Sequence, residues 1–183
     1  MTRESISIRP GRRDDGPELA AMVHAALHEH GLVPEPAGVD ADLMDVEERY
    51  LARGGCFEVL VNEAGDVVGC YGLVPGGDSV VELRKMFFKP ELRGRGIGSA
   101  LLKRAIGKAK DMGFSSMRLE TASCLVAAKK LYEHFGFVAL AGRPNVPRCD
   151  LAYQLDLGRL NKAARATPRY DFNDLPTQLE ESE

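Results

Sequence analysis

The sequence has few cysteines, no long apolar run and little net charge. Its four cysteines are widely and irregularly spaced, which leaves no Cys-x-x-Cys pair and no disulfide framework, so we interpret them as free thiols. No apolar run approaches about 18 residues, so no transmembrane helix is expected. The N-terminal segment also lacks an apolar signal core, and we therefore expect a cytoplasmic location.

The formal net charge is −3, which argues against general binding to nucleic acid or to an anionic membrane. Any site for an anion must therefore be local. The chain has 183 residues, of which 44% are hydrophobic and 28% charged, and this suits one globular domain with a sizeable core.

No cluster of metal ligands stands out either. His24 and His28 fall on one face of a predicted helix and could together hold zinc. His30 follows them, but no third ligand is signalled nearby, and a solvated or partly buried helix explains these histidines equally well. We therefore predict no metal site.

Residues 80–102 organise the rest of the chain. They open as an apolar run rich in Val, Leu and Phe, which predicts a buried strand. The run breaks at Lys89-Pro90, because proline has no N–H for a central ladder. A turn rich in arginine and glycine follows, and then an amphipathic helix. This layout suits phosphate binding, because glycine lets the backbone approach a ligand and a helix N-terminus offers unpaired N–H groups.

Three common glycine loops do not fit this turn. A P-loop requires a lysine after its second glycine, and none follows Gly98. A dinucleotide fingerprint requires Gly-x-Gly-x-x-Gly; Gly94 and Gly96 fit, but Ser99 stands at the third place. A kinase glycine loop joins two strands, whereas this turn opens a helix. The remaining pattern is Arg93-x-x-Gly96-x-Gly98.

That pattern resembles the acyl-CoA-binding signature of the GNAT superfamily of N-acetyltransferases, Arg/Gln-x-x-Gly-x-Gly/Ala. Three further blocks resemble the same family. Residues 82–88 (Glu-Leu-Arg-Lys-Met-Phe-Phe) look like the strand before the signature, and residues 119–121 (Leu-Glu-Thr) look like the end of the next strand. Residues 131–137 look like the family's late Leu-Tyr-x-x-x-Gly-Phe block. The blocks occur in the right order, which makes the match specific over residues 80–137.

The resemblance implies an α+β (mixed α/β) fold of the GNAT type. Its centre should be a mixed, mostly antiparallel sheet of about six to seven strands with a splayed parallel pair, flanked by about four helices. We expect an acetyltransferase domain at residues 1–157 and a C-terminal extension of unknown role at residues 158–183. Periodicity and turn residues predict strands at 5–9, 56–62, 67–74, 79–88, 115–121, 137–140 and 149–157, and helices within 14–30, 41–52, 96–112 and 124–135.

Two local features bear on the site. The apolar alternation in the 79–88 strand changes parity between Leu83 and Met86, which predicts a β-bulge near residues 84–86, although a strand buried on both faces would also lack alternation. The resemblance implies that such a bulge splays this strand and opens a slot for the pantetheine arm. It also implies that residues 32–53 lie over the acceptor pocket and help choose the substrate; a plain connector is the alternative. On the outer face of the helix at 96–112 we place four basic residues, Lys103, Arg104, Lys108 and Lys110.

The reaction that the resemblance implies is transfer of an acetyl group from acetyl-CoA to an amine. By position in the matching blocks, Glu82 is the candidate general base for the amine and Tyr132 the candidate general acid for the departing thiolate. The candidate acetyl-CoA residues lie at the strand end, in the glycine turn and at two later positions: Met86, Phe87, Phe88, Arg93, Gly94, Arg95, Gly96, Ile97, Gly98, Ser99, Thr121 and Lys129.

Three hypotheses on function remain. The first is an enzyme that acetylates a small-molecule or amino-acid-like amine. The second is acetylation of a protein lysine or N-terminus, and the third is a CoA-binding regulatory module without catalysis, against which Glu82 and Tyr132 argue weakly. We expect neither nucleic acid nor membrane as a partner. Many GNAT proteins pair, which makes a homodimer plausible.

Overall fold

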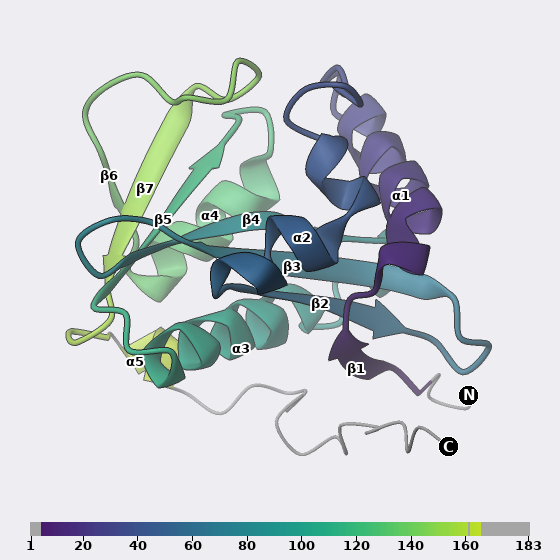
Figure 1. The fold of residues 1–183 in the computed structure, drawn as a ribbon. Helices are drawn as coiled ribbons and strands as arrows, with labels where there is room; N and C mark the ends of the chain where they lie inside the picture. The colour runs from purple at the N-terminus through teal and green to yellow at the C-terminus, as the bar shows by residue number, and fades with distance from the viewer. Residues whose placement is uncertain (1–4, 161, 166–183) are drawn as a thin grey trace.

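A seven-stranded mixed sheet forms the centre of the fold, in the order β1-β2-β3-β4-β5-β7-β6 (Figure 1). The computed structural model describes residues 5–160 and 162–165. Within them β4 and β5 pair in parallel, and the other neighbouring strands pair antiparallel, as expected. The strands are β1 (Ser7–Pro10), β2 (Cys56–Val61), β3 (Val67–Pro75), β4 (Val80–Phe88), β5 (Ser116–Thr121), β6 (Val138–Ala139) and β7 (Leu151–Asp156).

Helices cover both faces of this sheet. The helices α1 and α2 pack on one face, and α3 and α4 pack on the other (Figure 1). The α-helices are α1 (Gly16–Glu29), α2 (Val46–Arg49), α3 (Ile97–Asp111), α4 (Val126–Phe135) and α5 (Lys162–Arg165). Short 3-10 turns occur at η1 (Arg13–Asp15), η2 (Ala41–Met44), η3 (Leu51–Arg53) and η4 (Pro90–Leu92).

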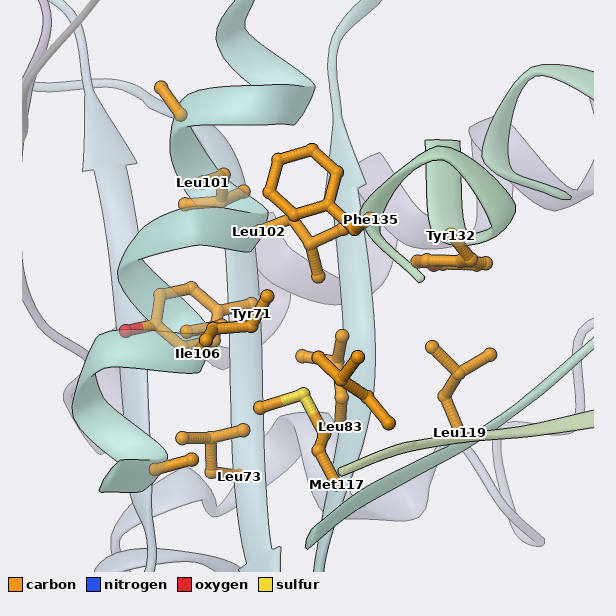
Figure 2. Close-up of a cluster of buried hydrophobic side chains, with 14 of the residues drawn as sticks. Tyr71, Leu73, Leu83, Leu101, Leu102, Ile106, Met117, Leu119, Tyr132 and Phe135 are labelled. Carbon is orange, nitrogen blue, oxygen red and sulfur yellow. The ribbon is translucent and has the colours of Figure 1, made fainter. Parts of the chain in front are cut away.

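The larger hydrophobic core lies between the sheet and the helices α3 and α4 (Figure 2). The i, i+4 spacing of the apolar residues of α3 puts Ile97, Leu101, Ala105 and Ala109 on its buried face. Side chains of three strands and two helices meet in Figure 2: Tyr71, Leu73, Leu83, Leu101, Leu102, Ile106, Met117, Leu119, Tyr132 and Phe135.

A second core forms on the opposite face, between the sheet and α1 and α2. Leu19, Val23 and Leu27 follow the helical period along α1 and are fully or almost fully buried. They pack in one cluster with Tyr50 and Phe57, whose rings meet edge to face with centroids 4.8 Å apart. This second core fixes α1 and the segment around α2 above β2 and β3.

The prediction that Arg104 lies on the outer face of α3 is wrong. Its side chain is 11% exposed, and its Nε donates to Glu58 on β2 at 2.6 Å. Glu58 also accepts a hydrogen bond from the hydroxyl of Tyr71 on β3. Burial acts to raise the pKa of Glu58, but the hydrogen bonds from Arg104 and Tyr71 outweigh it and lower the pKa. A buried carboxylate can therefore stay charged here, and it ties α3 to β2 and β3.

Several element bounds differ from those predicted. Residues 41–52 form η2, α2 and η3 in place of one helix, because Asp45 takes a non-helical conformation (φ −150°, ψ 69°) and caps α2 by accepting from the Glu48 N–H. The first strand covers Ser7–Pro10 and not residues 5–9. α4 starts at Val126, two residues later than predicted, and the last two strands are shorter than predicted.

The beginning of the C-terminal extension packs on the domain. Ala164 of α5 is buried in the larger core, and Leu160 packs against that core. The rest of the predicted extension, residues 166–183, lies outside the described residues.

Candidate active site

The parallel pair β4–β5 is joined only at its start. Val80, Val81 and Glu82 pair with Ser116, Met117 and Arg118, and no further pair of these strands follows within the described residues. A cleft of about 800 Å³ opens there, lined by residues of both strands together with parts of α1, α3 and α4. This confirms the expected splayed pair, and the side of β4 that faces β5 has no strand partner after Glu82 in the described chain.

The structure confirms the β-bulge in β4 that the change of parity in the sequence predicted. Two pairs, Gly72 with Arg84 and Cys70 with Phe87, enclose one residue on β3 and two on β4. Lys85 takes a left-handed conformation (φ 53°), which non-glycine residues rarely adopt. As a result, Leu83 belongs to the larger core, whereas Phe87 packs against the second core, and the residues after the bulge line the cleft.

The glycine turn runs from the end of β4 to the start of α3. Gly94 and Gly96 have φ angles of 69° and 85°, which side chains disfavour, and α3 begins directly after Gly96. A Cβ on Gly98 would lie 3.4 Å from atoms of Leu131 and Phe88. The start of α3 is therefore packed closely against β4 and α4, with the N–H groups of its first turn unpaired within the helix.

The cleft brings together all predicted site residues except Arg95 and Lys129. Lys129 lies 4.0 Å from Glu133 in an ion pair on α4 and does not line the cleft. Arg93 does line it, but its guanidinium donates to both carboxylate oxygens of Glu29, at the end of α1. Thr121 is 5% exposed and lies where β5 ends in the cleft.

Glu82 is the last residue of β4 that pairs with β5 within the described residues. Its carboxylate accepts a hydrogen bond from Arg84 at 2.6 Å, and its side chain is 29% exposed. Two further carboxylates line the cleft. Glu120 accepts three N–H bonds from Asn145 and Val146, and Asp42 accepts from the hydroxyl of Tyr50 at 2.6 Å. Glu82 has one partner, the exposed Arg84, so its carboxylate can accept more further hydrogen bonds than that of Glu120. Its side chain is also more exposed than that of Asp42, 29% against 14%.

Tyr132 reaches the cleft from α4. Its ring packs against Phe137 and Tyr153, with centroids 5.7 and 6.5 Å away, and the residue is 7% exposed. Its hydroxyl has no hydrogen bond within the described residues. Burial raises the pKa of Tyr132 to about 12, so the hydroxyl keeps its proton well above neutral pH.

A buried charge cluster beneath the bulge was missed by sequence reasoning. Lys85 Nζ donates to Asp40 at 2.5 Å and to the carbonyl of Val39 at 2.8 Å, and it lies 3.3 Å from Asp42. Arg148 donates to both oxygens of Asp40, at 2.8 and 2.7 Å. Burial acts to raise the pKa of Asp40, but the bonds from Arg148, from the Glu35 N–H and from Lys85 lower it to about 2. The signal in the sequence was a lysine inside an apolar strand.

The segment at residues 32–53 lies along the cleft, which favours a role beyond that of a plain connector. Its contribution to the lining includes Val39, Asp42, Arg49, Tyr50 and Arg53. Arg49 ends α2, and Arg53 ends η3.

Among the residues at 5–160 and 162–165, no group of three or more His, Cys, Asp or Glu side chains is arranged to hold a metal ion. None of the helices described is long and apolar enough to cross a membrane.

Known protein sequences are similar to this chain over the region of the cleft. The sequence model of the acetyltransferase (GNAT) family matches residues 22–137. The chain is 37% identical over 128 residues to the uncharacterized N-acetyltransferase YjgM of Escherichia coli K12, covering 67% of this chain and 76% of that protein. It is 41% identical over 98 residues to the N-acetylaspartate synthetase of Xenopus tropicalis, covering 52% of this chain and 36% of that protein.

Solved structures share the fold. A GNAT-family acetyltransferase from Staphylococcus aureus Mu50 aligns with a TM-score of 0.78 at 24% identity, covering 84% of this chain and 99% of that one. The spermidine N-acetyltransferase of Vibrio cholerae, solved with CoA and spermine, aligns with a TM-score of 0.63 at 17% identity, covering 88% and 98%.

Proposed function

Because this chain belongs to the GNAT family of acetyltransferases, we propose that it transfers the acetyl group of acetyl-CoA to a primary amine of a small molecule or amino-acid-like substrate. The observation that carries the proposal is the junction at which β4 leaves β5. One cleft there holds Glu82, Tyr132 and the glycine turn. The names of two similar proteins support a small acceptor, since one refers to aspartate and the other to spermidine.

The residues of the cleft fit acetyl-CoA. The turn at residues 94–99 offers backbone N–H groups at a helix N-terminus, where anions such as phosphates bind. Met86, Phe87 and Phe88 line the cleft on a stretch of β4 that has a strand partner on the β3 side alone within the described residues. We propose that this stretch pairs with the pantetheine amides as a strand would. Arg93 is a weaker candidate than the sequence suggested, because Glu29 already binds its guanidinium.

Bound acetyl-CoA supplies an activated thioester. An alkylammonium has a pKa of about 10, so about one amine in a thousand is free at neutral pH, and the acceptor needs a base. Glu82 accepts one proton from the ammonium group, and the freed amine nitrogen bonds to the acetyl carbon and then releases its second surplus proton to solvent. Tyr132 gives its hydroxyl proton to the sulfur as the carbon–sulfur bond breaks, and it regains a proton from solvent. The products are the N-acetylated amine and CoA with a free thiol.

Acetyl-CoA at 100 times its Kd is expected to stabilise the protein by about 2.7 kcal/mol, which corresponds to a rise in Tm of about 5–10 °C. Gly96→Val should remove this shift, because a side chain would occupy the place of the phosphates and distort the turn. The matched control is Gly113→Val. Gly113 has almost the same φ angle, 86° against 85°, but follows the end of α3, where an added Cβ would meet no atom within 4 Å. Equal loss of the shift in both variants would contradict the assignment.

Tyr132→Phe is expected to lower kcat by about 10²-fold, because the thiolate loses its proton donor. The loss should be the same at pH 7 and pH 9, since the pKa of Tyr132 is raised to about 12 and the wild-type donor stays protonated throughout. Tyr153→Phe is the control. That hydroxyl, bound to Glu133, lies outside the cleft lining, and its loss should leave kcat nearly unchanged. A Tyr132→Phe defect that vanishes at pH 9 would exclude the acid role.

The overall proposal is tested by release of CoA thiol in the presence of a panel of free amines and peptides. Amine-dependent release supports the enzyme. Release that requires a peptide would identify a protein acetyltransferase, and acetyl-CoA binding without release under any condition would identify a binding module.

A further inference from the structure

The carboxylates that line the cleft, those of Asp42, Glu82 and Glu120, already have partners within the protein. Glu82 pairs with Arg84, and Asp42 accepts from Tyr50 and lies 3.3 Å from Lys85. Glu120 accepts three N–H bonds from the loop that follows β6. Glu82 can still meet the amine that reacts, but the further amino groups of a polycationic acceptor would have to displace the internal partners of Glu120 or reach the buried Oδ1 of Asp42.

The cations of the same region are not all engaged. Arg49 and Arg53 are exposed and line the cleft. In the part of the chain that the structure describes, neither guanidinium has a hydrogen bond or an ion pair. Each is a planar fork of donors that matches a carboxylate or a phosphate in two-point contact.

The segment that carries these two arginines is held in place by the second core. Tyr50, between them, is fully buried against Phe57 and donates its hydroxyl to Asp42. α2 begins at a cap made by Asp45, whose side chain also binds Arg13 at 2.9 Å. The guanidiniums are thus presented by a fixed backbone, which lowers the cost of ordering them on a ligand.

We propose that the acceptor is an anionic amine, a primary amine that also carries carboxylate or phosphate groups, and that Arg49 and Arg53 bind those groups while the amine faces Glu82. This rests on the acetyltransferase function proposed above. The two arginines are then specificity residues, because they touch the acceptor away from the atoms that react.

The first test compares kcat/KM for acceptors that differ by one charged group. L-Aspartate is measured against L-asparagine, and phosphoethanolamine against ethanolamine, with spermidine as the cationic acceptor. We expect the anionic member of at least one pair to lead by about 10-fold or more, since charge-assisted hydrogen bonds discriminate on this scale. The pair with the larger ratio of kcat/KM values shows whether the arginines prefer a carboxylate or a phosphate. A preference for spermidine or for the neutral members would overturn the proposal and leave the acetyltransferase function intact.

The second test is the double variant Arg49→Gln, Arg53→Gln. It should raise KM for the anionic acceptor by about 10-fold or more and change kcat little, because these groups contribute to binding and not to the chemical step. The control is Arg159→Gln, whose side chain is 90% exposed and lies outside the cleft lining. An unchanged KM in the double variant would overturn the assignment.

A binding measurement decides the question even if no acceptor turns over. Calorimetric titration of L-aspartate and of phosphoethanolamine into the protein saturated with CoA uses a complex that cannot react. Binding by the wild type that weakens about 10-fold in the double variant supports the proposal. Absence of binding to both probes, with the acetyl-CoA thermal shift retained, counts against the anionic acceptor alone, whereas loss of that thermal shift counts against the function itself.

Discussion

Glu82→Gln is expected to lower kcat/KM for a primary amine by about 10²- to 10⁴-fold at neutral pH. Glutamine keeps the shape of the side chain and can still contact the neighbouring Arg84, but it cannot accept a proton. The loss should shrink as the pH rises toward the pKa of the amine, because solution then supplies free amine. Acetyl-CoA binding should be nearly unchanged, since Glu82 belongs neither to the glycine turn nor to the stretch of β4 at residues 86–88 that we propose for acetyl-CoA. The measurement is a pH–rate profile with the acetyl-CoA thermal shift taken alongside.

Glu120→Gln is the companion variant for that experiment. Glu120 lines the same cleft, but its oxygens already accept three N–H bonds from the protein, so they have less capacity to accept from a substrate. It should lack the pH-dependent defect of Glu82→Gln. If Glu120→Gln shows the pH-dependent defect and Glu82→Gln does not, Glu120 is the base and the assignment of Glu82 is wrong.

Asp40→Ala is expected to destabilise the protein by about 3 kcal/mol, or roughly 6–12 °C in Tm, and to impair catalysis as well. Its carboxylate has no exposed surface, and its loss leaves the nearly buried Lys85 and Arg148 without their main partner. Lys85 keeps the Val39 carbonyl and Asp42, 3.3 Å away, which limits the loss of stability. Urea unfolding measures the loss. Asp111→Asn, an exposed position at the end of α3, should change stability by less than about 0.5 kcal/mol.

The same cluster predicts the acid limb of stability. The pKa of Asp40 is lowered from 3.8 to about 2 in the folded protein, so the stability that it contributes is present above pH 3.8 and is lost as the pH falls through 2. The shift corresponds to about 2 kcal/mol for this buried group. The free energy of unfolding of Asp40→Asn should therefore fall less steeply between pH 4 and pH 2 than that of the wild type. If the free energy of unfolding falls equally steeply with pH in both proteins, Asp40 does not contribute to the loss of stability in acid.

The bulge connects this stability cluster to the site. Lys85 holds a backbone conformation that its residue type disfavours, and such strain persists only where surrounding contacts fix it. Asp40 supplies the main contact. The bulge determines which residues of β4 face the cleft, so we expect Asp40 to affect catalysis as a positioning residue, through Lys85.

The sequence alone determined most of the local elements of this protein and the place of its glycine turn. Strands and helices follow from apolar periods of two and of 3.6 residues, which are properties of adjacent residues. The glycine turn could be recognised because positive φ angles at Gly94 and Gly96 favour a residue without a side chain. The parity change in β4 indicated the bulge, because successive side chains of a strand alternate between its two faces.

The tertiary structure decided which charges meet. Asp40 lies 45 residues from Lys85 and 108 from Arg148, and Arg93 lies 64 residues from Glu29. The helical period assigns Arg104 to the surface, yet it binds Glu58 across 46 residues of chain. No local pattern encodes such pairs, because hydrophobic periodicity sets only the face on which a residue lies. The partner that it finds there depends on how the two cores bring distant segments of the chain together, and this decides which cations remain unpaired in the described part of the cleft.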